Sequence, residues 1–386
     1  MESTERSAPG ESVSAARVTL PSQADVVVVG GGIMGASALY YLTKLGCESA
    51  LLLERGTLAC GSTSKAAGGI RAQFSDELNV RIALECIRRF ERFEEEPGGE
   101  IDYKQWGYLF LLDGEADAVA FQRSLDVQQS LGVPSRWLEP PEAAEIVPGI
   151  IVDDLVGATF CPIDGYATPE AAVQGYARAA ADAGALIVQG AVVERVLAEG
   201  GRVNGIQTAD GVVGTERVIL CAGVWSRDLA ASAGVEIPVE PEKRYIWFTG
   251  PDPLVHELPL TIDFGSGFYL HREGDGVLFG GREQTLEDIA PVAAARLPAM
   301  AELSVRGGWW GLYENSPDHN AVVGQVADPL GLLYATGFSG HGFQQGPVIG
   351  EHLAELALGL APTFDLKPFG IERFASGVPR AELNVV

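Results

Sequence analysis

Residues 25–54, DVVVVGGGIMGASALYYLTKLGCESALLLE, carry the strongest indication of the fold of this chain. Val26 to Val29 form a β-branched run typical of a strand that is buried on both faces. Apolar residues with helical spacing follow as far as Leu45, and a second apolar run ends at Glu54. This order of strand, glycine-rich turn, helix, strand and acid predicts a dinucleotide-binding unit.

Three glycines in this stretch are spaced as G-x-G-x-x-G and define the expected phosphate site. Gly30 permits the tight turn out of the strand, Gly32 leaves its backbone open to a pyrophosphate, and Gly35 lets the helix pack close to the sheet. Ile33 and Met34 begin that helix, whose free N–H groups attract negative charge. A glycine-rich turn without a ligand is the alternative, but the complete order of elements favours the dinucleotide site.

The segment after this unit extends the expected site. Glu54 ends the second strand, where a carboxylate can accept hydrogen bonds from both ribose hydroxyls. Residues 61–71 are mostly small and include the hydroxyls of Ser62 and Thr63. Loops at the carboxyl ends of parallel strands line the ligand crevice, which favours a ligand-binding loop over a flexible surface loop.

Length and composition narrow the class of protein. The chain has 386 residues, which favours two domains. Its net charge of −25 argues against nucleic acid and anionic membrane surfaces as partners. Its five cysteines are scattered, without a C-x-x-C or a metal-ligand pattern, which predicts a reducing, cytoplasmic location and no metal site.

The sequence contains no pattern typical of a secretory signal or of a membrane segment. Residues 1–23 are rich in Ser, Ala and Glu and lack the apolar core of a secretory signal, so we expect a disordered tail. No stretch of the chain approaches the apolar length that a membrane span needs.

The remaining sequence predicts helices and short strands first, and longer strands later. Helices are expected at 76–96, 115–131 and 169–183, and strands at 108–112, 186–189, 192–197, 203–208, 212–215 and 218–223. Pro140-Pro141 is interpreted as part of a connection. Between 238 and 317 the segments 245–249, 267–272, 277–280 and 309–314 are typical of an antiparallel sheet, interpreted as a substrate domain. A last strand, 332–336, leads through a glycine loop into a final helix.

Four motifs carry a resemblance to a known family. They are the G-x-G-x-x-G fingerprint with Glu54, GSTSKAAGGIR at 61–71, ILCAGVWS at 219–226 and TGFSGHGF at 336–343. With them the chain resembles the D-amino-acid oxidase superfamily of flavoproteins, in the branch of sarcosine oxidase, dimethylglycine dehydrogenase and the proline dehydrogenase β-subunit. The resemblance extends from Asp25 to about Phe374.

The resemblance implies an α/β fold: a Rossmann-like FAD-binding domain with an interleaved antiparallel-sheet substrate domain, as in D-amino-acid oxidase and glutathione reductase. The FAD-binding domain is then expected at 24–100, 155–235 and 318–375. The substrate domain is expected at 101–154 and 236–317. Residues 376–386 are expected to be a tail without a role.

The resemblance also implies which residues hold FAD. The ADP half is expected on Gly30, Gly32, Ile33, Met34, Gly35, Glu54 and Arg55. The pyrophosphate and the flavin are expected along Ser62, Thr63, Ala66, Ala67 and Gly68. The adenine end is expected near Val193, Ala222, Gly223 and Trp225, and the flavin ring near Gly340, His341, Gly342, Phe343 and Gln344.

Departures from the relatives refine these expectations. Some relatives tether the flavin to a Cys just before a Tyr-x-x-x-Pro-Asp segment, where this chain has Gly311-Leu-Tyr313 and no Cys. Others tether it to a His in the glycine-rich loop, where this chain has Lys65 or a neighbour of it. We therefore predict non-covalent FAD. Monomeric sarcosine oxidases carry a carboxylate-binding Lys at the position of Gln344 and an oxygen-activating Lys near Leu278, so a different carboxylate pocket and a dehydrogenase-like preference are expected.

The candidates for the reaction itself are Arg71, Tyr269, His271, Tyr313, His341 and Gln344. Arg71 is the first choice for a substrate carboxylate, because a planar guanidinium suits bidentate binding; a structural ion pair is the alternative. For each residue on the aromatic strands, packing is as good an interpretation as substrate contact. His341 is expected to orient the backbone at the flavin rather than to act as a base.

The expected function is oxidation of the C–N bond of a secondary or N-methylated amino acid, similar to sarcosine, dimethylglycine or proline. The imine that forms would then hydrolyse. Alternatives are a D-amino-acid or simple amine oxidase or dehydrogenase, an NAD(P)H reductase, which would need a second nucleotide unit, and a non-catalytic FAD-containing assembly factor. A partner subunit or a homo-oligomer is possible on this resemblance.

Overall fold

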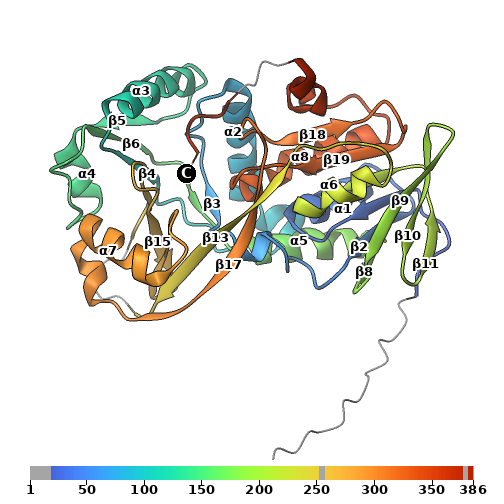
Figure 1. The fold of residues 1–386 in the computed structure, drawn as a ribbon, viewed down its shortest axis with the longest axis horizontal. Coiled ribbons are helices and arrows are strands. Elements are labelled where there is room, and N and C mark those ends of the chain that lie inside the picture. Colours follow the sequence, from blue (N-terminus) through green and yellow to red (C-terminus); the bar gives the residue numbers. More distant parts are fainter. Residues whose placement is uncertain (1–18, 252–256, 377–380, 386) are drawn as a thin grey trace, which may run out of the picture.

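The computed structural model of the protein describes residues 19–251, 257–376 and 381–385. Its strands form a six-stranded and an eight-stranded sheet, with two smaller sheets of three and two strands. Figure 1 shows the two large sheets side by side, each with its own helices. Of the expected disordered tail, residues 1–18 lie outside the described residues, whereas Gln23 forms a parallel bridge with Gly214, which corrects that expectation at its end.

The six-stranded sheet contains the predicted dinucleotide unit. Its strands, in order across the sheet, are β18 (Val322–Gln325), β19 (Leu332–Thr336), β12 (Val218–Leu220), β1 (Val26–Val29), β2 (Ala50–Glu54) and β8 (Leu186–Gln189). All neighbours are parallel except β18, which runs antiparallel to β19. The strand order reverses beside β1, which is where open sheets of this kind bind ligands.

Both faces of this sheet are covered, as the continuous apolar run of β1 predicts. Val26 and Val28 pack with helices α1 (Ile33–Lys44), α2 (Glu77–Glu91), α5 (Pro169–Asp182) and α8 (Gly342–Ala357). Val27 and Val29 pack on the other side with helix α6 (Ser226–Ala231) and the antiparallel strands β9 (Val193–Glu199), β10 (Arg202–Thr208) and β11 (Gly211–Gly214). Alternation along a strand sends successive side chains to opposite faces, so one run supplies both cores.

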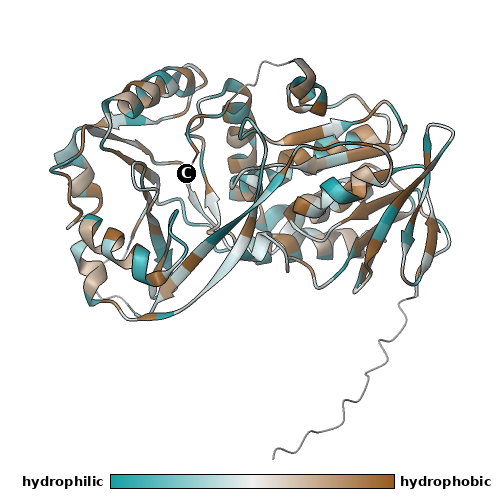
Figure 2. Cartoon of the chain, in the orientation of Figure 1, coloured by the Kyte–Doolittle hydropathy of each residue, from teal (hydrophilic) through white to brown (hydrophobic). Residues whose placement is uncertain are grey.

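The eight-stranded sheet forms the second layer system. Its order is β17 (Val305–Asn315), β13 (Glu240–Thr249), β16 (Gly276–Gly280), β15 (Tyr269–Glu273), β14 (Leu260–Asp263), β4 (Tyr108–Leu112), β6 (Gly157–Cys161) and β5 (Arg136–Leu138). Only the β14–β4 pair is parallel. The β4 residues Leu109 and Leu111 pack toward α4 (Pro140–Ile146) and α7 (Leu286–Arg296), and Phe110 packs against α3 (Glu115–Ser130). Figure 2 shows these helices carrying both hydrophobic and polar residues.

Several expectations from the sequence need correction here. The first long helix ends at Glu91 rather than at residue 96, and Pro140-Pro141 begins α4, because proline fits the first helical turn, where its missing N–H is not needed. Helix α7 interrupts the region expected to be only antiparallel strands. Strand β6 belongs to the eight-stranded sheet, so the chain returns to the six-stranded sheet after Cys161 and not at residue 155.

The segment expected to be a tail without a role is also packed. Within the described residues 381–385, Glu382 and Asn384 are buried. Figure 1 places this end of the chain between helices α2 and α3, close to the short strand β3 (Gly69–Ile70), which pairs with β7 (Gly165–Tyr166). In the part of the chain that the structure describes, no helix has the length and apolarity to cross a membrane.

Candidate active site

A cavity of about 1040 Å³ lies where the two large sheets meet. It follows the carboxyl ends of β1, β12 and β19, and it is closed on the other side by the long pair β13–β17. Its size is at the upper end of the about 300–1,000 Å³ typical of ligand sites. The walls combine glycine-rich backbone, aromatic side chains and a few charged groups.

The dinucleotide end of the cavity has the geometry that the glycine spacing predicts. Gly30 has a φ of +108°, and a Cβ there would lie 2.3 Å from the carbonyl oxygen of Cys221. A Cβ on Gly35 would lie 1.9 Å from the carbonyl oxygen of Gly30, so Gly35 serves the packing of α1 on β1 and does not line the cavity. The backbone N–H of Ile33 donates to Thr63 Oγ1 at 3.1 Å, which fixes the loop over the start of α1.

Glu54 is held at the end of β2 by backbone donors. Its Oε2 accepts from the N–H of Gly31 at 2.7 Å, and its Oε1 accepts from the N–H of Gly56 at 2.7 Å. Cys60 Sγ also donates to Oε1, at 3.5 Å. A carboxylate has about four lone-pair positions, so these three hydrogen bonds leave capacity on Oε2 for a ribose hydroxyl expected there. Close by, the guanidinium of Arg55 lies 3.8 Å from the centre of the Trp225 ring, and both side chains line the cavity.

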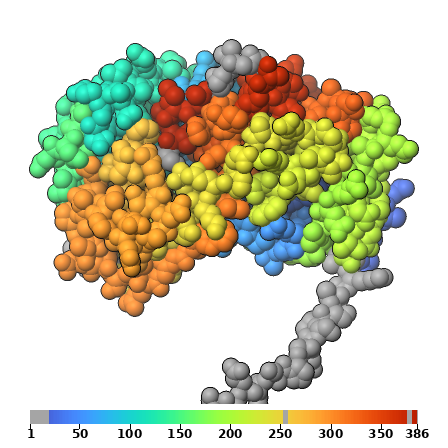
Figure 3. Space-filling model, in the orientation of Figure 1, coloured from blue at the N-terminus to red at the C-terminus, as the bar shows by residue number. Residues whose placement is uncertain are grey.

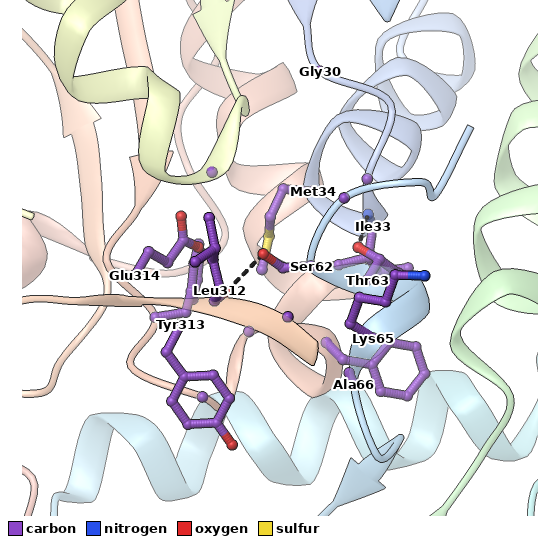
Figure 4. A pocket seen from close by; sticks show the side chains of 18 of the residues that line it. Gly30, Ile33, Met34, Ser62, Thr63, Lys65, Ala66, Leu312, Tyr313 and Glu314 are labelled. Carbon is purple, nitrogen blue, oxygen red and sulfur yellow. Dashed lines mark hydrogen bonds between the residues drawn. The ribbon is translucent and has the colours of Figure 1, made fainter. Parts of the chain in front are cut away.

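The small-residue loop after β2 is attached to the second sheet. Ser62 Oγ donates to the carbonyl oxygen of Leu312 at 2.7 Å, and Trp309 Nε1 donates to the carbonyl oxygen of Lys65 at 3.2 Å. A Cβ on Gly311 would lie 2.6 Å from Lys65 Cβ, so glycine is required for this approach. Figure 4 shows the Ser62–Leu312 bond joining the loop to β17 across the cavity.

The amino end of α8 supplies the wall opposite this loop. Gly340 has a φ of +93°, and a Cβ there would lie 2.4 Å from the ring of Tyr313. Both ring nitrogens of His341 are buried without a hydrogen-bond partner in the described structure. Burial, and then the charge of Arg71, lower the pKa of His341 to about 3, so its ring is neutral at physiological pH. Such a ring can exchange hydrogen bonds with a bound ligand but carries no charge to it.

Arg71 places a positive charge without a direct ion pair in the same cavity. One Nη donates to the carbonyl oxygen of Gln73, and Nη2 donates to the carbonyl oxygen of Asn384 at 2.6 Å. The guanidinium lies 4.1 Å from the centre of the Phe74 ring and is 6% exposed. No acidic side chain of the described residues forms an ion pair with it. The alternative of a structural ion pair for Arg71 therefore has no support here.

A second arginine, Arg244 on β13, also lines the cavity but is already paired. Its Nη2 lies 3.2 Å from Glu242 Oε1, and its guanidinium lies 5.3 Å from the centre of the Tyr313 ring. The Glu242 carboxylate offsets part of its charge, whereas only neutral carbonyls contact Arg71. An anionic ligand group is therefore attracted more strongly to Arg71.

The walls between the two arginines are aromatic and apolar. Tyr108, Tyr269 and Tyr313 line the cavity together with Phe110, Leu260 and Ile262. Burial raises the pKa of each of the three tyrosines, so their hydroxyls stay protonated. Gln344 contributes structurally as well, because its Oε1 accepts from the backbone N–H of Arg71 at 2.6 Å and so holds β3 against α8.

Glu314 is an acidic group in the cavity that the sequence did not single out. It projects from β17 on the side opposite to Tyr313 (Figure 4). Its Oε2 accepts from Thr336 Oγ1 at 2.8 Å, and burial raises its pKa to about 7. A carboxyl of this kind is partly protonated near neutral pH and can both donate and accept hydrogen bonds.

The structure brings nearly all of the expected site residues into this one cavity. The two exceptions are Gly35, described above, and His271. The His271 ring packs at a tilt against Tyr166, with 4.2 Å between ring centroids. Its Nδ1 lies 2.7 Å from the carbonyl oxygen of Arg272, and burial lowers its pKa to about 4. It lies on the same face of β15 as Tyr269 but about 6.6 Å further along the strand, beyond the cavity. The expectation that His271 belongs to the substrate pocket is therefore wrong.

The sequence reasoning missed residues on elements whose pairing could not be foreseen. Among them are Tyr108, Phe110, Arg244, Glu314 and Val385. For Tyr108 and Phe110 there was a weak indication in the sequence, because both lie on a predicted aromatic strand. Placing that strand at the cavity requires knowing that the two sheets meet there. Nothing in the pattern around Val385 indicated a site.

The residues present fit an extended dinucleotide such as FAD. The cavity runs from the amino end of α1 past Glu54 and the small-residue loop to the amino end of α8. Gly30 and Gly340 both line this cavity at positions where close contact with Cys221 and Tyr313 excludes a side chain, and the two buried ring nitrogens of His341 have no hydrogen-bond partner among the described residues. Among the described residues there is no group of ligands suited to a metal ion.

Comparisons with known proteins agree with this geometry. A family described as FAD dependent oxidoreductase, DAO, matches residues 25–356. The chain is 31% identical over 424 residues to FAD-dependent oxidoreductase domain-containing protein 1 of Bos taurus, covering 92% of this chain and 86% of that protein. It is 30% identical over 382 residues to 4-methylaminobutanoate oxidase (formaldehyde-forming) of Paenarthrobacter nicotinovorans, covering 92% of this chain but 46% of the oxidase. The crystal structure of L-proline dehydrogenase from P. horikoshii superposes with a TM-score of 0.88 at 32% identity, covering 94% of this chain and 100% of that chain.

Proposed function

Because this chain belongs to the DAO family of FAD-dependent oxidoreductases, we propose that it oxidises the C–N bond of a small amino acid whose nitrogen is secondary or N-methylated. The observation that carries the proposal is Arg71, a buried guanidinium without an acidic partner at the wall of the cofactor cavity. A buried charge of this kind is costly unless an anion joins it, and a substrate carboxylate would be that anion.

The names of the relatives support this substrate class. The name 4-methylaminobutanoate oxidase describes an N-methyl amino acid, and L-proline is a secondary amino acid; both combine such a nitrogen with a carboxylate. The chain spans less than half the length of the first of these proteins, so its activity is brought to this chain only as a proposal.

The cofactor is FAD, and the chain's own residues would hold it along the whole cavity. The start of α1 would contact the pyrophosphate and Glu54 the ribose, while the loop at Ser62–Gly68 and the start of α8 would enclose the flavin. When bound, FAD supplies the two-electron oxidant that a C–N bond requires.

Different residues at the substrate end would contact different parts of the substrate. Arg71 would hold the carboxylate through its planar fork, and this fixes the distance of the oxidised carbon from the flavin. The apolar wall of Leu260 and Ile262 would exclude water and select small hydrocarbon groups. His341 is neutral, so it can accept a hydrogen bond from the substrate nitrogen without repelling its positive charge.

Anaerobic flavin bleaching with matched pairs of amines tests this proposal. The pairs are proline with pyrrolidine, sarcosine with dimethylamine, and 4-methylaminobutanoate with N-methylpropylamine; each second compound lacks the carboxylate. We expect at least one acid to bleach the flavin, about tenfold faster or more than its partner amine, the effect of one charge-assisted hydrogen bond. Equal bleaching by the amines would indicate a simple amine dehydrogenase. No bleaching by any compound, D-alanine included, would favour a non-catalytic FAD protein.

A further inference from the structure

The segment Glu382–Val385 is anchored by buried polar contacts at the amino end of α2. Both the backbone N–H and the hydroxyl of Ser75 donate to Glu382 Oε1 at 2.8 Å, and Asn79 Nδ2 donates to Oε2 at 2.9 Å. The Glu382 side chain is 2% exposed. A carboxylate beside the first turn of a helix is also favoured by the helix dipole, so this anchor is strong.

A second anchor joins the segment to the loop after β3 and to helix α3. Asn384 is fully buried; its Nδ2 donates to the carbonyl oxygen of Gln73 at 3.3 Å, and Ser124 Oγ on α3 donates to its Oδ1 at 3.4 Å. Its own carbonyl oxygen accepts from Arg71 Nη2 at 2.6 Å. Figure 3 shows the last residues of the described chain, in dark red, at the surface beside the teal α3 region.

The next residue reaches the cavity itself. Val385 lines the same cavity as Arg71, Tyr108 and Phe110, and Asn384 joins it to the anchor. The segment therefore contributes both a partner of the carboxylate-binding candidate and a piece of apolar wall next to it.

We propose that Glu382–Val385 forms the outer wall of the substrate end and determines its specificity, a role that rests on the proposed function of Arg71. The Asn384 carbonyl sets the direction of the guanidinium, and Val385 limits the size of the group attached to the carboxylate. Among the described residues, the segment also brings no carboxylate into contact with Arg71, so the positive charge of the guanidinium is not neutralised by it. The one carboxylate of the segment, Glu382, is satisfied by Ser75 and Asn79, and Arg71 receives only a neutral carbonyl.

The donor count of Arg71 leaves room for a ligand. A guanidinium has five N–H donors, and two of them are taken by the carbonyls of Gln73 and Asn384. Three donors remain for a carboxylate. Without the Asn384 contact, the Arg71 side chain could adopt other rotamers. The segment therefore affects carboxylate binding by holding the guanidinium in one orientation.

Glu382→Gln tests the wall through its anchor. The substitution keeps the shape of the side chain but turns an NH₂ group toward donors that need an acceptor. Leu383→Ala is the matched control, because Leu383 is the neighbouring residue and is 56% exposed. The readout is the dissociation constant of two probes of the FAD-loaded protein, cyclopentanecarboxylate and its neutral counterpart cyclopentylmethanol, measured from changes in the flavin spectrum.

In the native protein and Leu383→Ala, the carboxylate should bind more tightly than the alcohol. In Glu382→Gln that preference should fall about tenfold, with FAD content unchanged, because one charge-assisted contact becomes misaligned. An unchanged preference in a folded, FAD-loaded Glu382→Gln protein overturns the inference. Should this variant not fold, Asn384→Ala, which removes the contacts to Gln73 and Ser124, is read in the same way.

The two failures can be told apart. If the native protein binds both probes equally, the proposed role of Arg71 fails. In that case Val385→Trp tests whether Val385 forms a wall of the substrate end. The larger side chain should weaken binding of both probes at least about tenfold through steric overlap, and unchanged binding would refute a wall at this position.

Discussion

The sharpest perturbation of the site is Arg71→Lys, which keeps the charge and removes the fork. In the native protein two of the five donors contact the carbonyls of Gln73 and Asn384, and three remain. A lysine ammonium has three donors. If it keeps both carbonyls, only one donor remains, and the bidentate contact to a carboxylate becomes a single one.

The size of the effect follows from that one lost bond. A hydrogen bond to a charged group contributes about 1.5–3 kcal/mol. Since 1.4 kcal/mol is a factor of ten, KM for the amino acid should rise about 10- to 150-fold. The constant kcat should fall less, unless the misplaced carboxylate also moves the oxidised carbon away from the flavin.

Steady-state kinetics with the best substrate of the bleaching panel measure this change. FAD content per chain is determined in parallel. Arg244→Lys is the matched control, because Arg244 lines the same cavity but is already paired with Glu242, and its KM should stay within about threefold of the native value. A native KM in Arg71→Lys refutes the reasoning. Loss of FAD with KM intact would make Arg71 a cofactor residue.

Three further predictions concern the attachment of FAD, the role of Glu54 in holding it, and the protonation of Glu314. Since residues 311–318 contain no Cys and residues 61–71 contain no His that could tether the flavin, acid precipitation should release the yellow colour into the supernatant; colour in the pellet would contradict non-covalent binding. Glu54→Gln should weaken FAD retention on dialysis by about 1–3 kcal/mol, and native-like retention would move ribose binding elsewhere. Burial raises the pKa of Glu314 to about 7 from an ordinary 4.5, so its stabilising contribution is complete below pH 4.5 and is lost as pH rises through 7. Glu314→Gln should therefore flatten the fall of Tm between pH 5 and 8, and a Tm profile parallel to that of the native protein would disprove this assignment.

The dinucleotide end of the site could be predicted from the sequence because its determinants are local. Gly30, Gly32 and Glu54 lie within thirty residues of each other, and the turn and the helix that follow allow one arrangement. The glycine loop at Gly340 was predictable for the same reason, since a glycine between a buried strand and a helix indicates a close approach of backbone.

The substrate end could not be predicted because distant segments assemble it. Tyr108 comes from a strand in the middle of the eight-stranded sheet, and Val385 comes from a segment without any apolar pattern. The error at His271 has the same origin: its place on an aromatic strand made it a candidate, but only the packing against Tyr166 shows that it lies outside the cavity. The alternation of residues shows which face of a strand a side chain lies on, but not whether that point along the strand reaches the cavity.

A crystal structure of the FAD-loaded protein with cyclopentanecarboxylate would show directly whether Arg71 binds a substrate carboxylate. We predict that the carboxylate lies about 2.7–3.2 Å from nitrogen atoms of Arg71, with the Asn384 carbonyl still accepting from Nη2 and the ring between Val385 and the flavin. A carboxylate bound to Arg244 instead, with Arg71 contacting only its two carbonyls, would contradict it.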